Sequence, residues 1–274
     1  MSKPAIVIVP GSWHRPQHYH LLTSSLSSSG YETTAVATPS LDSHPPHASW
    51  DQDAAAVRAV ITQYLDAGRD VVAVGHSFGG VVVSEAVKGL GKKGREERGL
   101  EGGVVRLVYV CAMALPEGES HVTQMKPVTD EEEEVMRRKD EMNKKVQGIR
   151  IEEVRLFLWA KKVDGSMTLN KDIIGEVFYN GCDEKDIAEA IELLGSYPSG
   201  PLAVPVTYTA YREIPSTYLI CENDQALHVA FQNRMVAQGE GAFDVERCQE
   251  GHSPFMSNPK LVAECVRRAA GERV

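Results

Sequence analysis

The stretch Gly75-His76-Ser77-Phe78-Gly79 centres a serine between two glycines, where the β-branched run "DVVAVG" ends and a helical pattern begins. A sharp strand-to-helix turn forces its central residue into a strained backbone conformation, and small neighbours relieve the crowding. The Ser77 hydroxyl would then project above the end of the strand, close to the unpaired N–H groups of the helix that starts at Phe78. The pattern predicts a nucleophilic serine next to a site for negative charge.

A serine hydroxyl becomes a good nucleophile only when a base takes its proton and a carboxylate orients that base. Two loops farther along the chain offer these groups. Glu222 and Asp224 follow the apolar run "STYLIC", and His252 follows "FDVERC". The order serine, acid, histidine is one in which such triads occur. Spacing alone leaves both Glu222 and Asp224 open as the acid.

The loop "VPGSWH", after the first apolar run, is expected to complete an oxyanion hole. Gly11 lets the backbone approach the substrate closely, and Ser12 or Trp13 offers an amide to act with that of Phe78. His76 either lines the pocket or packs against the turn.

Composition narrows the function classes. The chain has 274 residues and a formal net charge of -9, which argues against nucleic acid as a partner. The mixed-charge run "DEEEEVMRRKDEMNKK" is interpreted as a solvated helix face. No segment approaches the roughly 20 apolar residues needed to span a bilayer. We therefore expect a cytoplasmic protein that does not bind membranes.

Metal and redox chemistry are not expected. The five cysteines are scattered and form no CxxC pair, which favours a reducing compartment. His14, His18 and His20 are clustered but have no acidic ligands nearby.

Short apolar runs alternate with helical patterns, as in a mostly parallel sheet with helices on both faces. The strands are expected at residues 5–9, 31–39, 70–75, 104–113, 216–221 and 243–248, and helices at 50–65, 78–90 and 259–270. Residues 1–114 and 206–274 would form this α/β core. Residues 115–205 show helical patterns and no strands, which predicts an inserted helical lid with helices at 129–146, 150–162, 170–179 and 183–195. Thr129 and Glu132 resemble a capping box opening the first of these helices.

With these motifs the chain resembles the α/β-hydrolase superfamily over nearly its whole length. The resemblance is to the lid-bearing branch that contains plant methyl-ester esterases and hydroxynitrile lyases. "GSWH" is similar to that branch's oxyanion loop, "LICENDQALHVAFQ" to its acid loop and "EGHSPFMSNP" to its histidine loop. The resemblance implies Asp224 as the triad acid and the Ser12 amide as the second oxyanion donor.

Two departures from the branch bear on the reaction. Its lyases carry a Thr in the oxyanion loop and a Lys after the triad histidine, whereas this chain has Gly11 and Ser253. Nothing here replaces the charge that would stabilise departing cyanide, so cyanohydrin cleavage is not expected. Pro10 stands where many relatives have His, and we have no mechanistic account of that change.

The sequence thus predicts a serine hydrolase for a carboxylic ester or lactone of a small, largely apolar acid, requiring no cofactor. Ser77, His252 and Asp224 are the predicted triad. Two alternatives remain: other chemistry with the same triad, such as C–C cleavage, cyclisation or elimination, and a slow-turnover ligand receptor. The protein is expected to be a monomer or homodimer, and its substrate-contact candidates are Gly11, Trp13, His76, Trp159 and Phe178.

Overall fold

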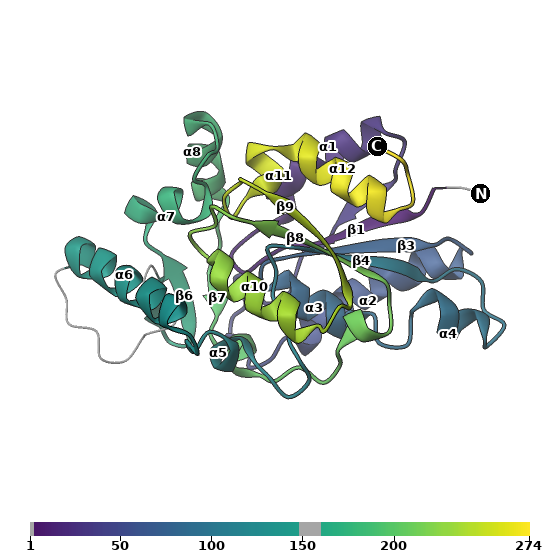
Figure 1. Cartoon of the computed structure of the whole chain (residues 1–274), viewed down its shortest axis with the longest axis horizontal. Helices are drawn as coiled ribbons and strands as arrows, with labels where there is room; N and C mark the ends of the chain where they lie inside the picture. Colours follow the sequence, from purple (N-terminus) through teal and green to yellow (C-terminus); the bar gives the residue numbers. More distant parts are fainter. Residues whose placement is uncertain (1–2, 148–159) are drawn as a thin grey trace.

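A six-stranded parallel sheet forms the centre of the molecule (Figure 1). The structure is a computed structural model that describes residues 3–147 and 160–274. The strand order of the sheet is β2-β1-β3-β4-β8-β9, and every neighbouring pair runs parallel. The strands are β1 (Ala5–Val9), β2 (Thr33–Ala35), β3 (Val71–His76), β4 (Val104–Val110), β8 (Ser216–Cys221) and β9 (Phe243–Cys248). The mostly parallel α/β sheet predicted from the sequence is confirmed.

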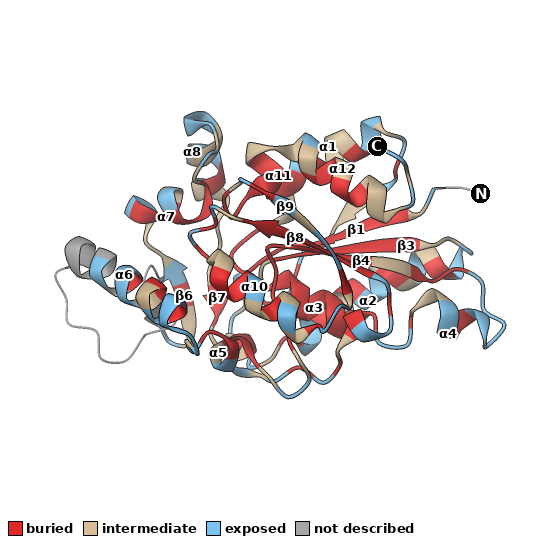
Figure 2. Ribbon diagram, viewed as in Figure 1, coloured by how far each residue is buried: buried red, intermediate tan, exposed pale blue. Residues whose placement is uncertain are grey.

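Helices cover both faces of this sheet (Figures 1 and 2). One face carries α1 (His20–Ser28), α11 (Pro254–Ser257) and α12 (Pro259–Ala269), and the other carries α2 (Asp51–Asp66), α3 (Gly79–Ala86) and α10 (Val229–Gln238). Every residue of β1, β3 and β8 is buried, so these strands read as continuous apolar runs instead of alternating ones. Helix α1, the 3-10 turn η1 (Pro16–Tyr19) and the short α4 (Lys92–Glu96) were not predicted, and β2 is shorter than expected.

Between β4 and β8 the chain makes a long excursion, residues 111–215, which we call the inserted segment. In Figure 1 its helices α6, α7 and α8 lie beyond the end of the sheet where the strands finish, and its last residues return to the start of β8. Its helices are α5 (His121–Gln124), α6 (Asp130–Gln147), α7 (Lys171–Phe178), α8 (Glu184–Leu193), α9 (Gly200–Ala203) and the 3-10 turn η2 (Ala210–Arg212). The predicted helices 129–146, 170–179 and 183–195 correspond to α6, α7 and α8.

The expectation that this segment contains no strands is wrong. β5 (Ala160–Val163), β6 (Ser166–Leu169) and β7 (Tyr197–Pro198) form a small antiparallel sheet. Asp164 and Gly165, both with positive φ, make the turn between β5 and β6, which is typical of a tight hairpin. The predicted helix 150–162 lies outside the described residues up to 159, and the chain is a strand from Ala160 onwards.

The capping box is half formed. Thr129 Oγ1 accepts from the Glu132 backbone N–H at 3.2 Å, as predicted. The Glu132 carboxylate instead accepts from the Val128 N–H at 2.8 Å and pairs with Arg234 of α10 at 2.7 Å. The glutamate therefore joins the inserted segment to the core. No helix in the described parts of the chain is long and apolar enough to cross a membrane.

The turn from β3 into α3 requires glycine for space. A Cβ at Gly79 would collide with the carbonyl oxygen of Val9 and lie 2.6 Å from that of Pro10. A Cβ at Gly75 would lie 2.9 Å from the Gly79 carbonyl. The glycines thus let α3 start directly against the end of β1.

We expect Gly79→Ala to lower the free energy of unfolding by about 1–3 kcal/mol, because rigid backbone must move to admit a methyl group. The control is Gly94→Ala in α4, where a Cβ would meet open space among the described residues. Alanine there should stabilise by up to about 1 kcal/mol through helix propensity. Urea denaturation of both variants measures the difference, and equal effects would refute the packing argument.

Candidate active site

Ser77 is the one accessible residue of an otherwise buried stretch. From Val71 to Val87 every residue is buried except Ser77, which is half-buried. Its φ is +52°, a left-handed conformation that a residue with a Cβ adopts at an energetic cost. The Ser77 carbonyl accepts from the N–H groups of Gly80 and Met113 at 3.1 and 2.9 Å, which holds the strained turn in place. The structure therefore presents the serine at the carboxyl end of β3, as the sequence predicts.

The three predicted triad residues lie in one hydrogen-bonded chain. His252 Nε2 is 3.1 Å from Ser77 Oγ, and His252 Nδ1 is 2.7 Å from Asp224 Oδ2. The ionised carboxylate can only accept, so Nδ1 carries the proton and Nε2 is free to accept from the serine hydroxyl. His252 and Asp224 are 2% and 0% exposed, so water does not compete for these bonds.

The loop after β8 holds Asp224 by several donors. Its Oδ1 accepts from the backbone N–H groups of Ala226 and Leu227, both at 2.8 Å. Gln232 of α10 approaches Oδ2 at 3.4 Å and also bonds the backbone of Cys221 and Leu227. The buried carboxylate is thus satisfied and fixed in direction.

Glu222, the other candidate acid, turns away from this centre. It pairs with Arg247 at 3.1 Å on the surface, and its bonds to Gln249 and then Arg247 lower the pKa of its carboxyl. The geometry therefore brings Asp224, not Glu222, to His252.

A second polar chain lies beneath the serine and joins three loops. The Gly11 N–H donates to the Tyr19 hydroxyl oxygen at 3.1 Å, and that hydroxyl is 2.8 Å from His76 Nδ1. His76 Nε2 is 2.9 Å from the His252 carbonyl oxygen. We call these four residues the support chain, because they link the oxyanion loop, the serine turn and the histidine loop.

The protons of the support chain follow from burial. Desolvation raises the pKa of Tyr19 well above its usual value, so the phenol stays protonated and donates to His76. Burial, followed by the nearby His252, lowers the pKa of His76 well below its usual value, so its ring is neutral. The remaining His76 proton sits on Nε2 and donates to the His252 carbonyl. Both ring nitrogens are occupied, so His76 packs against the turn and turns no polar atom towards a ligand.

The oxyanion loop comes close to the serine because residue 11 is glycine. A Cβ at Gly11 would lie 2.8 Å from Ser77 Cβ and 3.0 Å from His76 Nδ1. Within the described residues, the backbone N–H groups of Ser12 and Phe78 donate to no other group. The two predicted oxyanion donors are therefore available beside the serine turn.

Aromatic side chains surround the serine and histidine. Phe178 of α7 packs 5.3 Å from the His252 ring and 6.0 Å from the Trp13 ring. Tyr197 of β7 packs 6.0 Å from Phe78 and 5.9 Å from Trp13. Trp159, also predicted to contact substrate, lies outside the described residues.

Two residues at the site were not assigned from the sequence. Tyr19 bonds Gly11 and His76, and buried His14 stacks on Phe178 at 5.4 Å and lies 3.2 Å from the Tyr179 hydroxyl. Both belong to "SWHRPQHYH", in which the sequence predicted Ser12 and Trp13 at the site and a metal role was rejected for its histidines. An aromatic residue ten positions after an apolar strand gives no signal that it reaches back under the serine.

One trio of possible metal ligands occurs among the described residues. Side-chain atoms of His76, Cys111 and His252 lie within 4.8 Å of one another. Both His76 nitrogens are already hydrogen bonded, and burial raises the pKa of the Cys111 thiol to about 12. A protonated thiol and an occupied imidazole are poor ligands, so these residues do not fit a metal centre.

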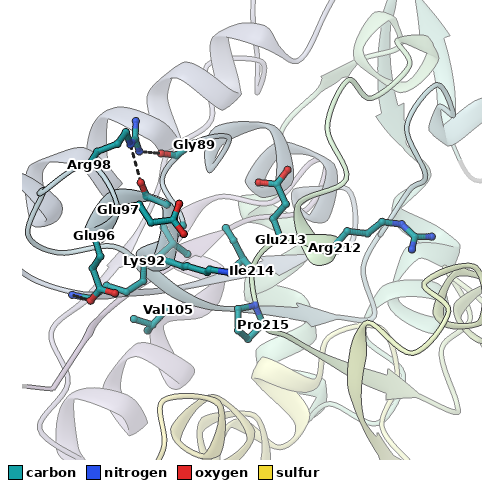
Figure 3. Close-up of a pocket in the computed structure, with 14 residues that line it drawn as sticks. Gly89, Lys92, Glu96, Glu97, Arg98, Val105, Arg212, Glu213, Ile214 and Pro215 are labelled. Carbon is teal, nitrogen blue, oxygen red and sulfur yellow. Dashed lines mark hydrogen bonds and ion pairs between the residues drawn. The ribbon is translucent and has the colours of Figure 1, made fainter.

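A separate groove of about 710 Å³ lies at the other end of the sheet (Figure 3). It is bounded by α4 and by the residues that lead into β4 and β8, with Lys92, Glu97, Arg98, Arg212 and Glu213 among its lining. Ser77 follows the opposite, carboxyl end of β3. The groove is therefore distinct from the candidate active site.

Comparison with known proteins agrees with this fold. Residues 6–265 match the model of the alpha/beta hydrolase family. The chain belongs to that family.

Individual relatives are similar over their whole length. The chain is 45% identical over 275 residues to the alpha/beta hydrolase nvfD of Aspergillus novofumigatus, covering 100% of this chain and 99% of the relative. Among solved structures, a pyrethroid hydrolase from Sphingobium faniae superposes with a TM-score of 0.75 at 17% identity, covering 98% and 97% of the two chains. The methylesterase MES16 from Arabidopsis gives 0.67 at 18% identity, covering 97% and 99%. The predicted resemblance to the α/β-hydrolase superfamily is thus confirmed, and the fold is shared with a plant methylesterase.

Tyr19→Phe tests the support chain. The change keeps the ring but leaves the buried Gly11 N–H and His76 Nδ1 without their partner, which should cost about 1–3 kcal/mol of unfolding free energy. The control is Tyr64→Phe, whose hydroxyl bonds Thr34 and Glu32 near the surface. Water can replace those bonds, so the control should lose less than about 1 kcal/mol. If chemical denaturation finds the same loss of unfolding free energy in both variants, the support chain does not stabilise the fold.

Proposed function

We propose that the protein is a serine hydrolase that cleaves a carboxylic ester or lactone of a small, largely apolar substrate. The observation that carries the proposal is the chain from Ser77 Oγ through the His252 ring to Asp224, with distances of 3.1 and 2.7 Å. A strained, half-exposed serine with a base at hydrogen-bond distance is suited to attack a carbonyl carbon.

Each residue has a role that follows from its position. Ser77 attacks the carbonyl while His252 Nε2 accepts its proton, and Asp224 stabilises the imidazolium that results. The N–H groups of Ser12 and Phe78 stabilise the oxyanion. His252 then returns the proton to the leaving oxygen, and water releases the acid by the same route.

The aromatic surroundings support an apolar substrate. Phe178 packs on the His252 ring and on Trp13 of the oxyanion loop, and both aromatic side chains are 3% exposed. Such walls exclude water and strengthen the hydrogen bonds to the developing charge. Since Phe178 and Tyr197 come from the inserted segment, we propose that residues 115–205 act as a lid that selects the acyl group.

Ser77→Ala should lower turnover of a short-chain aryl ester by at least about 10³-fold, because no acyl-enzyme can form. It should also abolish labelling by a fluorophosphonate probe. Ser84→Ala is the control, since that buried hydroxyl lies on α3 and bonds Gly80 and Tyr109 instead. Undiminished labelling of a folded Ser77→Ala protein would exclude this nucleophile.

Failure of the folded wild type to label would reject the hydrolase proposal itself. Rapid labelling without release of acid from a panel of esters and lactones would instead favour other triad chemistry. Slow single turnover with a ligand-dependent rise in melting temperature would favour a receptor.

Asp224→Asn and Glu222→Gln form a matched pair of isosteric changes. Asp224→Asn should lower kcat by about 10³- to 10⁴-fold, because the amide no longer holds the productive tautomer of His252. Glu222→Gln should stay within about twofold, since an exposed ion pair contributes little. Steady-state kinetics of both variants provide the measurement, and a larger loss for Glu222→Gln would reverse the assignment of the acid.

A further inference from the structure

The inward face of α6 carries charged side chains. Glu132, Val135 and Lys139 are all buried, and their spacing of three and four residues places them on one side of the helix. Burying a charge is costly unless a partner compensates it. Glu132 has Arg234 of α10 as its partner. Lys139 makes a different contact, with the loop that carries Asp224.

Lys139 binds the backbone of the loop that carries Asp224. Its Nζ donates to the Ala226 carbonyl oxygen at 2.7 Å. The N–H of the same Ala226 donates to Asp224 Oδ1 at 2.8 Å. Ala226 is therefore held at its N–H by the triad acid and at its C=O by a lysine from the inserted segment. Displacing the lysine would loosen one of the donors that direct Asp224 towards His252.

The charges around this contact are coupled. Burial lowers the pKa of Lys139 to about 8, and the negative charge of Asp224 opposes that shift. Burial and then Lys139 lower the pKa of His121 to about 3, and the same two causes lower that of His228. Among the described residues, Glu131 and Arg138 on α6 also act electrostatically on His228 beside this contact. Within this set, Lys139 is the group whose charge changes just above neutral pH.

We infer that Lys139 is a positioning residue for the proposed hydrolysis: from α6 it fixes the Ala226 carbonyl and thereby the loop that holds Asp224 against His252. The inference rests on the proposed function. Lys139 touches neither the substrate carbonyl nor the serine in this scheme and acts through Asp224. Its positive charge also compensates the buried carboxylate while His252 is neutral.

The sign of the pH dependence follows directly. Lys139 is charged below about pH 8 and loses its charge as the pH rises through that value. Activity that depends on the ammonium should therefore fall on the alkaline side. Stability should move the other way, because a folded-state pKa below the usual value means that the fold disfavours the ammonium. The contribution of Lys139 to the free energy of unfolding is therefore lowest below about pH 8. It increases as the pH rises from about 8 to the usual lysine pKa of 10.5.

The experiment compares the wild type with Lys139→Met, Lys139→Arg and the control Lys171→Met. Lys171 is on α7 of the same inserted segment, and its ion pair with Glu192 is exposed. Hydrolysis of an aryl acetate is followed from about pH 6 to about pH 9.5, with the spontaneous rate subtracted. Thermal melts near neutral pH check that all four proteins are folded.

The wild type and Lys171→Met should lose kcat above about pH 8. Lys139→Arg should move that loss to higher pH, because a guanidinium stays charged. Near neutral pH, Lys139→Met should have about tenfold lower kcat than the wild type, which corresponds to one pKa unit of lost charge stabilisation. Its kcat should not fall further as the pH rises. Its melting temperature near neutral pH should not fall, whereas a purely structural lysine would lower it.

If Lys139→Met has the wild-type kcat and loses activity at high pH as the wild type does, the inference is overturned. The hydrolase proposal would remain intact. If the wild type fails to react with the fluorophosphonate, the hydrolase proposal fails, and the positioning role is then read from amide hydrogen exchange. Exchange at Ala226 and Leu227 should be faster in Lys139→Met than in Lys171→Met. Equal exchange rates in the two variants would overturn the inference by this route as well.

Discussion

The support chain is the constraint on which the site depends, because it joins segments that the sheet alone would not align. The Gly11 N–H, the Tyr19 hydroxyl, the His76 ring and the His252 carbonyl follow one another at 3.1, 2.8 and 2.9 Å. All of these groups are buried, so each lost bond would leave a polar atom without water. The oxyanion loop, the serine turn and the histidine loop therefore keep a fixed relation before any substrate arrives. Such preorganisation lets fixed dipoles stabilise charge without first reorienting.

Two of the proposed triad residues were predicted from local signals in the sequence. Ser77 lies in a five-residue motif with a strand before and a helix after it, and His252 follows the last strand in the expected order. Asp224 could not be separated from Glu222 by spacing, and the resemblance to a known branch selected it. In the structure the choice comes from three-dimensional contacts, since Asp224 is 0% exposed and Glu222 pairs with Arg247 at the surface. The six strands of the main sheet and the longer helices were predicted because their periodic apolar patterns reflect burial.

What the sequence missed depends on contacts between distant segments. The helix face within "DEEEEVMRRKDEMNKK" was interpreted as solvated, which holds for exposed Arg137 and Arg138 and is wrong for Glu132 and Lys139. The sequence does not distinguish a charged residue on the buried face of a helix from one on the exposed face. Only the partner that it contacts in the folded protein shows which face it occupies. The hairpin between β5 and β6 did have a signal, since Asp-Gly is typical of a tight two-residue turn. Asp164 and Gly165 fall between the predicted helices 150–162 and 170–179, and the prediction of an all-helical insertion missed this turn.

The two buried charges of α6 also bear on how the inserted segment is joined to the core. An apolar inner face would bury with less electrostatic cost, and replacing buried ion pairs by apolar groups often stabilises a protein. Apolar contacts, however, tolerate sliding and rotation, whereas charge-assisted hydrogen bonds fix both distance and direction. Glu132 bonds Arg234 on α10, and Lys139 bonds the carbonyl of Ala226 beside Asp224. Since α10 also supplies Gln232 to the acid loop, one contact meets the helix and the other meets the loop that together hold the Asp224 carboxylate. The inserted segment is thereby joined to the loop of the proposed triad acid, and we expect a shift of α6 to reach His252 through Asp224.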